Sequence, residues 1–135
     1  MAQTKYPYVA RGNQRVNVVT SKEFNIDNGS GTTDDDVLLN LPFDVQIVSV
    51  RAIYTVATDT TGAASANFKL GVAAGGDTIV AATALAVSKA IGSTTTATVL
   101  ADHLPANTTL WVRHTGVAAT EVGNYRVQVT YIAKP

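Results

Sequence analysis

The chain has 135 residues, no cysteine, and ten Lys and Arg side chains against ten Asp and Glu side chains, so its formal net charge is zero. At about 100–200 residues per domain, this length corresponds to one domain. The balanced charge disfavours a globally basic nucleic-acid binder. The lack of cysteine excludes a disulfide framework, a Cys-based zinc site and a cysteine nucleophile.

The composition favours strands over helices. Threonine occurs 19 times, valine 18 times and isoleucine 6 times, whereas the chain has two glutamates, one methionine and four glutamines. β-Branched side chains are stiff at χ1 and fit a pleated, half-buried surface. The scarce residue types are the strong helix formers. We therefore expect an all-β fold.

The first 22 residues differ in charge from the rest of the chain. They contain four basic residues, two tyrosines and no acidic residue, whereas the remaining 113 residues hold six basic and ten acidic side chains. We expect residues 1–25 to form an extended N-terminal arm and residues 26–135 to form a β-sandwich domain. The arm either docks on an acidic or apolar partner surface or covers its own domain with its tyrosines, and the residues leave both interpretations open.

The N-terminus has no apolar stretch of the length that a signal peptide needs. The longest weakly polar stretch, residues 79–91, is too short and too interrupted to span a bilayer, which requires about 20 apolar residues. We expect a soluble protein that is made in the cytoplasm and has no membrane partner.

Eight short segments have the alternation or the β-branched content of strands. Residues that favour turns separate them, among them Asn28, Gly29, Gly75, Gly76 and Gly92. Strands at this spacing are typical of a sandwich or a barrel. In chain order, the expected strands are 16–20, 37–41, 45–57, 67–72, 78–82, 94–100, 110–115 and 124–132.

The alternation also predicts which side chains share a face of the sheet. In 124–132 the face with apolar side chains holds Tyr125, Val127, Val129 and Tyr131. In 45–57 one face holds Val48, Val50, Tyr54 and Val56, and the other holds Ile47, Ser49, Arg51, Ile53 and Thr55. Segment 83–91 could be a strand or a short helix. We favour a strand, because its apolar residues do not form a continuous helical stripe.

The densest acidic run is Asp34, Asp35 and Asp36. Several oxygen ligands can hold a hard cation such as Ca²⁺, but the spacing here does not match an EF-hand loop. We interpret the run as part of a solvated loop before the strand that starts at Val37. Contact with a cation or with the basic arm of another subunit remains an alternative.

The candidates for catalysis are weak. His103 and His114 are the two histidines, and Asp102 adjoins His103, but no G-x-S-x-G element accompanies them. We expect no catalytic residue, no metal site and no cofactor, and we expect His114 to be a polar strand residue at an end of the sheet. Trp111 alternates with Val112, so it either points outward or enters the core after a register shift.

The C-terminal half has a recognisable texture. Residues 104–113 read LPANTTLWVR and lead through Gly116 and a loop of small residues to the closing strand GNYRVQVTY at 123–131. Upstream, residues 48–58 (VSVRAIYTVAT) and 66–71 (ANFKLG) complete the pattern. In this texture the chain resembles the small jelly-roll decoration, or cement, proteins that stud the capsids of tailed bacteriophages.

The resemblance implies a single jelly-roll-like β-sandwich with an extended N-terminal arm, a structural role rather than an enzymatic one, and a place on the capsid surface of a virion. It implies two partners, other copies of the chain in a homotrimer and the major capsid protein, and no nucleic acid. The residues expected to contact the capsid are Lys5, Tyr6, Tyr8, Arg11 and Arg15. The alternative is a receptor- or carbohydrate-binding domain of a phage tail or fibre, with Trp111 as a stacking platform.

Overall fold

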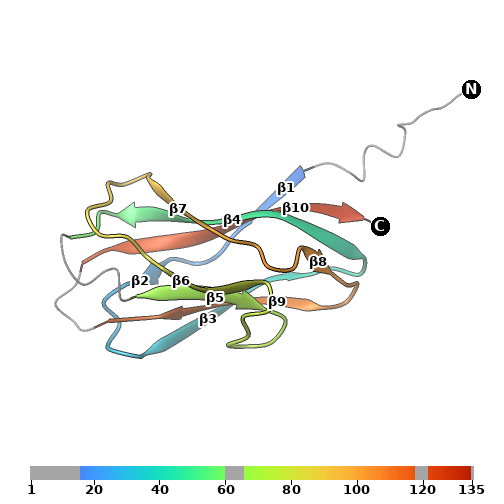
Figure 1. The fold of residues 1–135 in the computed structure, drawn as a ribbon, viewed down its shortest axis with the longest axis horizontal. Coiled ribbons are helices and arrows are strands. Elements are labelled where there is room, and N and C mark those ends of the chain that lie inside the picture. The colour runs from blue at the N-terminus through green and yellow to red at the C-terminus, as the bar shows by residue number, and fades with distance from the viewer. Residues whose placement is uncertain (1–15, 60–65, 118–121, 135) are drawn as a thin grey trace, which may run out of the picture.

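The computed structural model describes residues 16–59, 66–117 and 122–134, and within them it contains ten strands and no helix (Figure 1). The strands form two antiparallel sheets, which confirms the predicted all-β sandwich. In chain order they are β1 (Val16–Thr20), β2 (Phe24–Asn25), β3 (Thr33–Asn40), β4 (Asp44–Val56), β5 (Asn67–Gly71), β6 (Val80–Ala84), β7 (Thr94–Ala97), β8 (His103–Leu104), β9 (Thr109–Thr115) and β10 (Asn124–Lys134).

The order of the strands is that of a jelly roll. Sheet A has six strands in the order β1-β10-β4-β7, with β2 paired to β10 and β8 paired to β4. Sheet B has four strands in the order β3-β9-β5-β6. The short strands β2 and β8 have two residues each. The other eight strands are divided four to each sheet and are connected as two Greek keys. Ten strands thus replace the expected eight.

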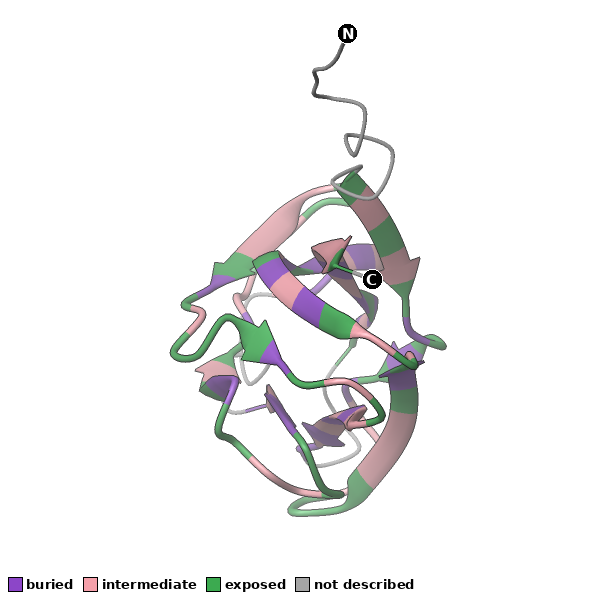
Figure 2. Ribbon diagram, turned by 90° about the vertical axis from the view of Figure 1, so that its right-hand side faces the viewer, coloured by how far each residue is buried: buried purple, intermediate pink, exposed green. Residues whose placement is uncertain are grey.

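The core lies between the two sheets, and the alternation along the central strands forms it. In β10, Tyr125, Val127 and Val129 are fully buried, as predicted, while the residues between them lie on the other face. In β9, Leu110 and Val112 are fully buried in the same way, and Figure 2 shows this banding of buried and less buried residues along the strands. Two sheets packed face to face bury alternate residues of every strand, so the period of two in the sequence identifies the inner faces.

β4 departs from the predicted alternation. Ile47 is buried, and Val48, which was expected on the face of Val50 and Tyr54, is 49% exposed. The cause is a β-bulge: Ser49 is opposite Thr130 and Ile47 is opposite Tyr131, so Val48 is an extra residue in its strand. The bulge shifts the alternation and turns Val48 toward the outer face of sheet A. Val56, at the end of β4, is also exposed.

The strand predicted at 83–91 is wrong beyond Ala84, where β6 ends. The chain then passes from sheet B to sheet A through residues 85–93. Ser88 has a left-handed φ of 56° and Gly92 a φ of 87°, and neither value is compatible with a continuous strand. Backbone hydrogen bonds from Ser88 to Asp59 and from Gly92 to Tyr54 hold this connection against the end of β4.

The connection between β5 and β6 folds back over the outer face of sheet B. A Cβ atom on Gly71 would lie 2.4 Å from the carbonyl carbon of Gly76, and a Cβ on Gly75 would lie 2.5 Å from Nη1 of Arg113. Gly75 also has a φ of 76°, which favours glycine. The turn predicted at Gly75 and Gly76 is confirmed. Because these residues have no side chain, the turn packs closely on Gly71 of β5 and on Arg113 of β9.

Substitution of Gly71 tests this packing. In Gly71→Ala the new methyl group meets rigid backbone rather than a flexible side chain, so we expect the free energy of unfolding to fall by about 1–3 kcal/mol. Urea denaturation followed by tryptophan fluorescence measures the change. Val72→Ala, at an exposed residue of the same connection, is the control and should change the stability by less than about 0.5 kcal/mol. Equal urea midpoints for the two variants would show that the contact between the backbones of Gly71 and Gly76 is loose.

Candidate functional site

The five residues predicted to contact the capsid, Lys5, Tyr6, Tyr8, Arg11 and Arg15, lie outside the described residues. Within the expected arm of residues 1–25, the described part comprises residues 16–25. These residues include β1 and β2, which both pair with β10. The segment that precedes Val16 therefore joins the fold at the edge of sheet A.

The edge of sheet A where this segment joins has exposed apolar side chains. Val16 is 56% and Val18 54% exposed on β1, whereas Val19 points the other way and packs against the core. Ile132 of β10 is opposite Val16 and is half-buried. With Val48 on the bulge of β4, these residues form an apolar strip on the outer face of sheet A.

Beside this strip the outer face carries two arginines, Arg51 on β4 and Arg126 on β10, both exposed. Nε of Arg51 donates a hydrogen bond to the side-chain oxygen of Gln128 at 2.8 Å, and Nη1 of Arg126 donates to the carbonyl oxygen of Ser21 at 3.1 Å. Among the described residues neither guanidinium forms an ion pair. The alternation in the sequence placed Arg126 on a polar face and Arg51 on a face that also holds Ile47 and Ile53, but nothing in it distinguished them from other surface cations.

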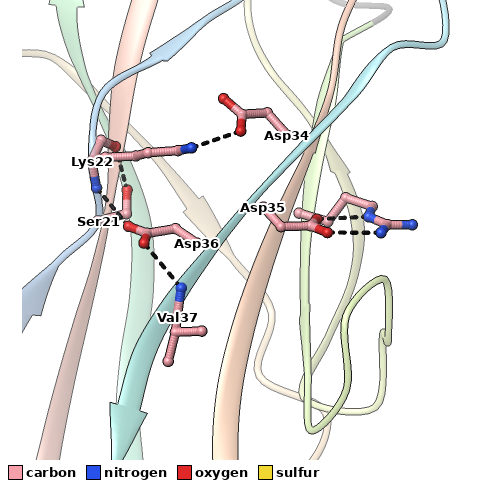
Figure 3. Close-up of polar contacts among 7 residues, drawn as sticks. Ser21, Lys22, Asp34, Asp35, Asp36 and Val37 are labelled. Carbon is pink, nitrogen blue, oxygen red and sulfur yellow. Dashed lines mark hydrogen bonds and ion pairs between the residues drawn. The ribbon is translucent and has the colours of Figure 1, made fainter.

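Lys22 lies between β1 and β2 of sheet A, and it contacts acidic residues of β3 in sheet B (Figure 3). Nζ of Lys22 lies 2.7 Å from Oδ1 of Asp34, and the backbone N–H of Lys22 donates to Oδ2 of Asp36 at 2.8 Å. Asp36 also accepts a hydrogen bond from the backbone N–H of Val37. Asp34 therefore forms an ion pair with Lys22, and Asp36 accepts hydrogen bonds from the backbone of Lys22 and Val37.

Asp35 points to the opposite side of β3 and forms a bidentate pair with Arg113 of β9. Nε and Nη2 of Arg113 donate to the two carboxylate oxygens at 2.7 and 2.8 Å. These hydrogen bonds lower the pKa of the Asp35 carboxyl below its ordinary value. The interpretation of Asp34, Asp35 and Asp36 as a solvated loop was wrong, because β3 begins at Thr33 and two of the three carboxylates pair with Lys22 and Arg113. The part of the chain described by the structure holds no group of three or more potential metal-ligating side chains.

The two histidines lie in contrasting environments. His103, on β8, has a side chain that is 61% exposed and lies 4.0 Å from Asp44. His114 is the second-last residue of β9, so it is a strand residue near an end of sheet B as expected, and it is fully buried between the sheets. Nδ1 of His114 is hydrogen-bonded to the hydroxyl of Tyr125 across the sandwich at 2.5 Å, and its ring stacks on Phe24 with 5.6 Å between centroids.

Burial lowers the pKa of His114 to about 4, and the nearby Asp34 opposes this shift only in part. Because this value lies below the ordinary value of 6.5, the unfolded chain takes up the proton first as the pH falls. The contribution of His114 to the free energy of unfolding is therefore fully present above pH 6.5 and is lost progressively as the pH falls toward 4.

We expect the free energy of unfolding to decrease by roughly 2 kcal/mol between pH 7.5 and 5, measured by urea denaturation at each pH. His114→Gln should flatten this dependence, even if the variant is less stable at every pH. His103→Ala, which removes the exposed histidine, should leave the dependence unchanged. NMR titration of the imidazole protons gives each pKa directly, and a pKa near 6.5 for His114 would contradict the assignment.

Trp111 lies on the outer face of sheet B, so the outward orientation is the one of the two alternatives that the structure shows. Its position in β9 is opposite Val37 of β3 on one side and Gly71 of β5 on the other. The indole is half-buried, and Val37 is 47% exposed. The described residues enclose no pocket, so Trp111 belongs to an open surface. No helix within 16–59, 66–117 or 122–134 is long and apolar enough to cross a membrane.

No family model matches this chain, and no curated protein matches it. A chain of a solved structure, "Cyanophage Pam1 capsid asymmetric unit", has a similar fold with a TM-score of 0.62. The two chains are 22% identical, and the similarity covers 100% of the present chain and 93% of the other. At this level of identity the comparison shows a shared fold, and it does so over the whole length of the chain.

Proposed function

We propose that the protein is a structural component of a bacteriophage virion, a decoration or cement protein that binds the outer surface of the capsid as a homotrimer and stabilises the capsid lattice. The proposal assigns it no reaction and no cofactor. The observation that carries it is the jelly-roll fold shared over the full chain with a chain of a cyanophage capsid asymmetric unit.

Residues 1–15 are the proposed anchor to the major capsid protein. They contain Lys5, Arg11 and Arg15 without an acidic residue, so an acidic capsid surface would attract them. Tyr6 and Tyr8 would fill shallow apolar pockets, because a tyrosine brings a large apolar ring with a polar tip and few rotatable bonds.

Trimerisation suits the physical character of the domain. β1 is the edge strand of sheet A and has no charged residue within Val16–Thr20, whereas an exposed edge that must stay monomeric usually carries charges or proline. A closed ring of three copies would cover such edges. Three anchors on one particle would also raise the net affinity through effective concentration, even where each contact is weak.

Deletion of residues 1–15 tests the anchor. Because β1 starts at Val16, the shortened chain keeps every described strand, and we expect it to fold with an unchanged thermal midpoint. Its retention on phage heads assembled without the protein should fall by at least about 100-fold, measured by co-sedimentation. A variant of the full chain with residues 1–15 in scrambled order keeps the charge and length and tests whether the sequence of the anchor matters. Unchanged retention of the deletion variant would contradict the anchor, and full-length protein that never binds heads would contradict the proposed function.

A second candidate function, binding of a carbohydrate receptor by a tail or fibre domain, draws on the outward position of Trp111. An exposed indole can stack on a sugar ring. A glycan array followed by calorimetry separates the two functions: a decoration protein should bind no glycan saturably. Saturable binding that Trp111→Ala abolishes and Val37→Ala preserves would favour the second function instead.

A further inference from the structure

One continuous segment runs along a side of the sandwich. β6 is an edge strand of sheet B and β7 is an edge strand of sheet A, and residues 85–93 connect them (Figure 1). After β7 the chain returns toward sheet B, where the backbone N–H of Leu100 donates to the carbonyl oxygen of Ile79 at 2.8 Å. We call residues 78–101 the β6–β7 side, because they contain an edge strand of each sheet.

The β6–β7 side is almost free of charge. Among its 24 residues Lys89 is the single charged one, and its Nζ donates a hydrogen bond to the carbonyl oxygen of Thr94 at 3.3 Å. Ile91 is 72% and Leu100 is 61% exposed, the highest values among the large apolar side chains that the structure describes. Edge strands without charge or proline are open to another chain, and exposed apolar surface beside them favours such a contact.

The opposite side of the sandwich differs in this respect. There β1 and β3 contact each other, and β3 is the other edge strand of sheet B. β3 carries three adjacent carboxylates, Asp34, Asp35 and Asp36. Charged side chains on an edge strand prevent pairing with another chain. Sheet B therefore has one protected edge, β3, and one unprotected edge, β6.

A surface without charge requires a partner surface without charge, because a charged group brought against it would lose its hydration without gaining an ion pair. The chain itself has a surface of this kind, the apolar strip on the outer face of sheet A, with Val16, Val18, Val48 and Ile132. Thr130, which is opposite Val18 and Ser49 in the middle of the strip, is also uncharged. The strip and the β6–β7 side thus match in character.

The charged residues of the outer face of sheet A surround the strip. Asp44 and Lys134 are opposite each other beyond Ile132, and Arg51 is one row beyond Thr130. The other three lie at the margins of the face. Glu23 and Arg126 are toward the end where Thr55 donates to Glu23, and Asp102 is on the far side of β4, where it accepts a hydrogen bond from Gln46. The face as a whole is mixed in charge, and its apolar part is the strip.

The two matching surfaces lie in different directions on the domain. The strip is on the outer face of a sheet, whereas the β6–β7 side runs along the edges of both sheets. A contact between unlike surfaces is heterologous, and it closes a ring only when it rotates each copy relative to the next. A contact between a face and a side introduces such a rotation, whereas a contact between opposite edges of one sheet would extend the assembly in a line.

We infer that the β6–β7 side of one copy packs on the apolar strip of the next copy, and that this heterologous contact closes the homotrimer. The inference rests on the proposed function, which assigns a trimer, and it names the two surfaces that hold the trimer together. Because neither surface supplies an unpaired charge to the contact, we expect self-association to change little with salt.

A single charge placed on each surface tests the contact. Leu100→Glu alters the β6–β7 side and Val18→Glu alters the strip, and Val72→Glu is the control, at a 44% exposed valine on the connection between β5 and β6. Circular dichroism first checks that each variant is folded, and Leu100→Gln or Val18→Gln replaces a variant that is not. Sedimentation velocity over a range of protein concentrations then measures association. We expect Leu100→Glu and Val18→Glu to weaken it by at least about 100-fold, because an unpaired charge is costly to bury, and Val72→Glu to change it by less than about twofold.

A mixture of the two variants distinguishes a heterologous contact from one between like surfaces. Leu100→Glu keeps an intact strip and Val18→Glu keeps an intact β6–β7 side, so one good contact remains between unlike copies. We expect an equimolar mixture to form a complex of two chains, although neither variant associates alone. A strip-to-strip contact would let Leu100→Glu associate alone, and a side-to-side contact would let Val18→Glu do so. Either result overturns the inference.

Phage heads assembled without the protein separate this inference from the proposed function. If the natural chain forms trimers and neither variant weakens them, the inference is overturned and the proposed function stands. If the natural chain trimerises as described but does not bind heads, the proposed function fails and the contact stands. A chain that trimerises only on heads is tested there by chemical cross-linking of the same variants. If cross-linking also finds single copies on heads, the homotrimer and the inference both fail.

Discussion

The fold depends on the dry layer between its two sheets. The chain has no cysteine, and its structure rests on apolar side chains that alternate along strands paired on both sides, above all Val127 and Val129 of β10 and Val112 of β9. The polar contact within this layer, between His114 and Tyr125, joins the two sheets and is fully buried. A hydrogen bond in such surroundings fixes how the sheets lie on each other, because either partner alone would be a buried polar group without compensation.

Local pattern predicted the fold class, the limits of β1 and the inner face of β10, and it left the orientation of Trp111 open. These features depend on the period of two and on turn residues, which the sequence displays directly. The bulge at Val48 could not be read in this way, because its cause is the register with β10. The strand character of Asp34, Asp35 and Asp36 was missed for a related reason: an acidic run is favourable in a strand only when distant cations neutralise it.

The charges of the described residues divide into two kinds. Pairs such as Asp35 with Arg113 are satisfied within the chain and connect neighbouring strands of sheet B. Arg51 and Arg126 on sheet A bond only to neutral groups. For the proposed contact surface itself, the residues that precede Val16 were identified from charge composition alone.

The antiparallel pairing of β1 with β10 also has a practical consequence for engineering. Val16 is opposite Ile132, so a polypeptide fused after the C-terminal strand would leave the domain at the end where the N-terminal segment enters (Figure 1). A tag or displayed cargo there would crowd that segment. The turn around Gly29 and Gly31, on the connection between β2 and β3, lies at the opposite end of β1's partner strand, where Ile26 bonds to Gly123. An epitope inserted there would lie at the end of the domain away from Val16.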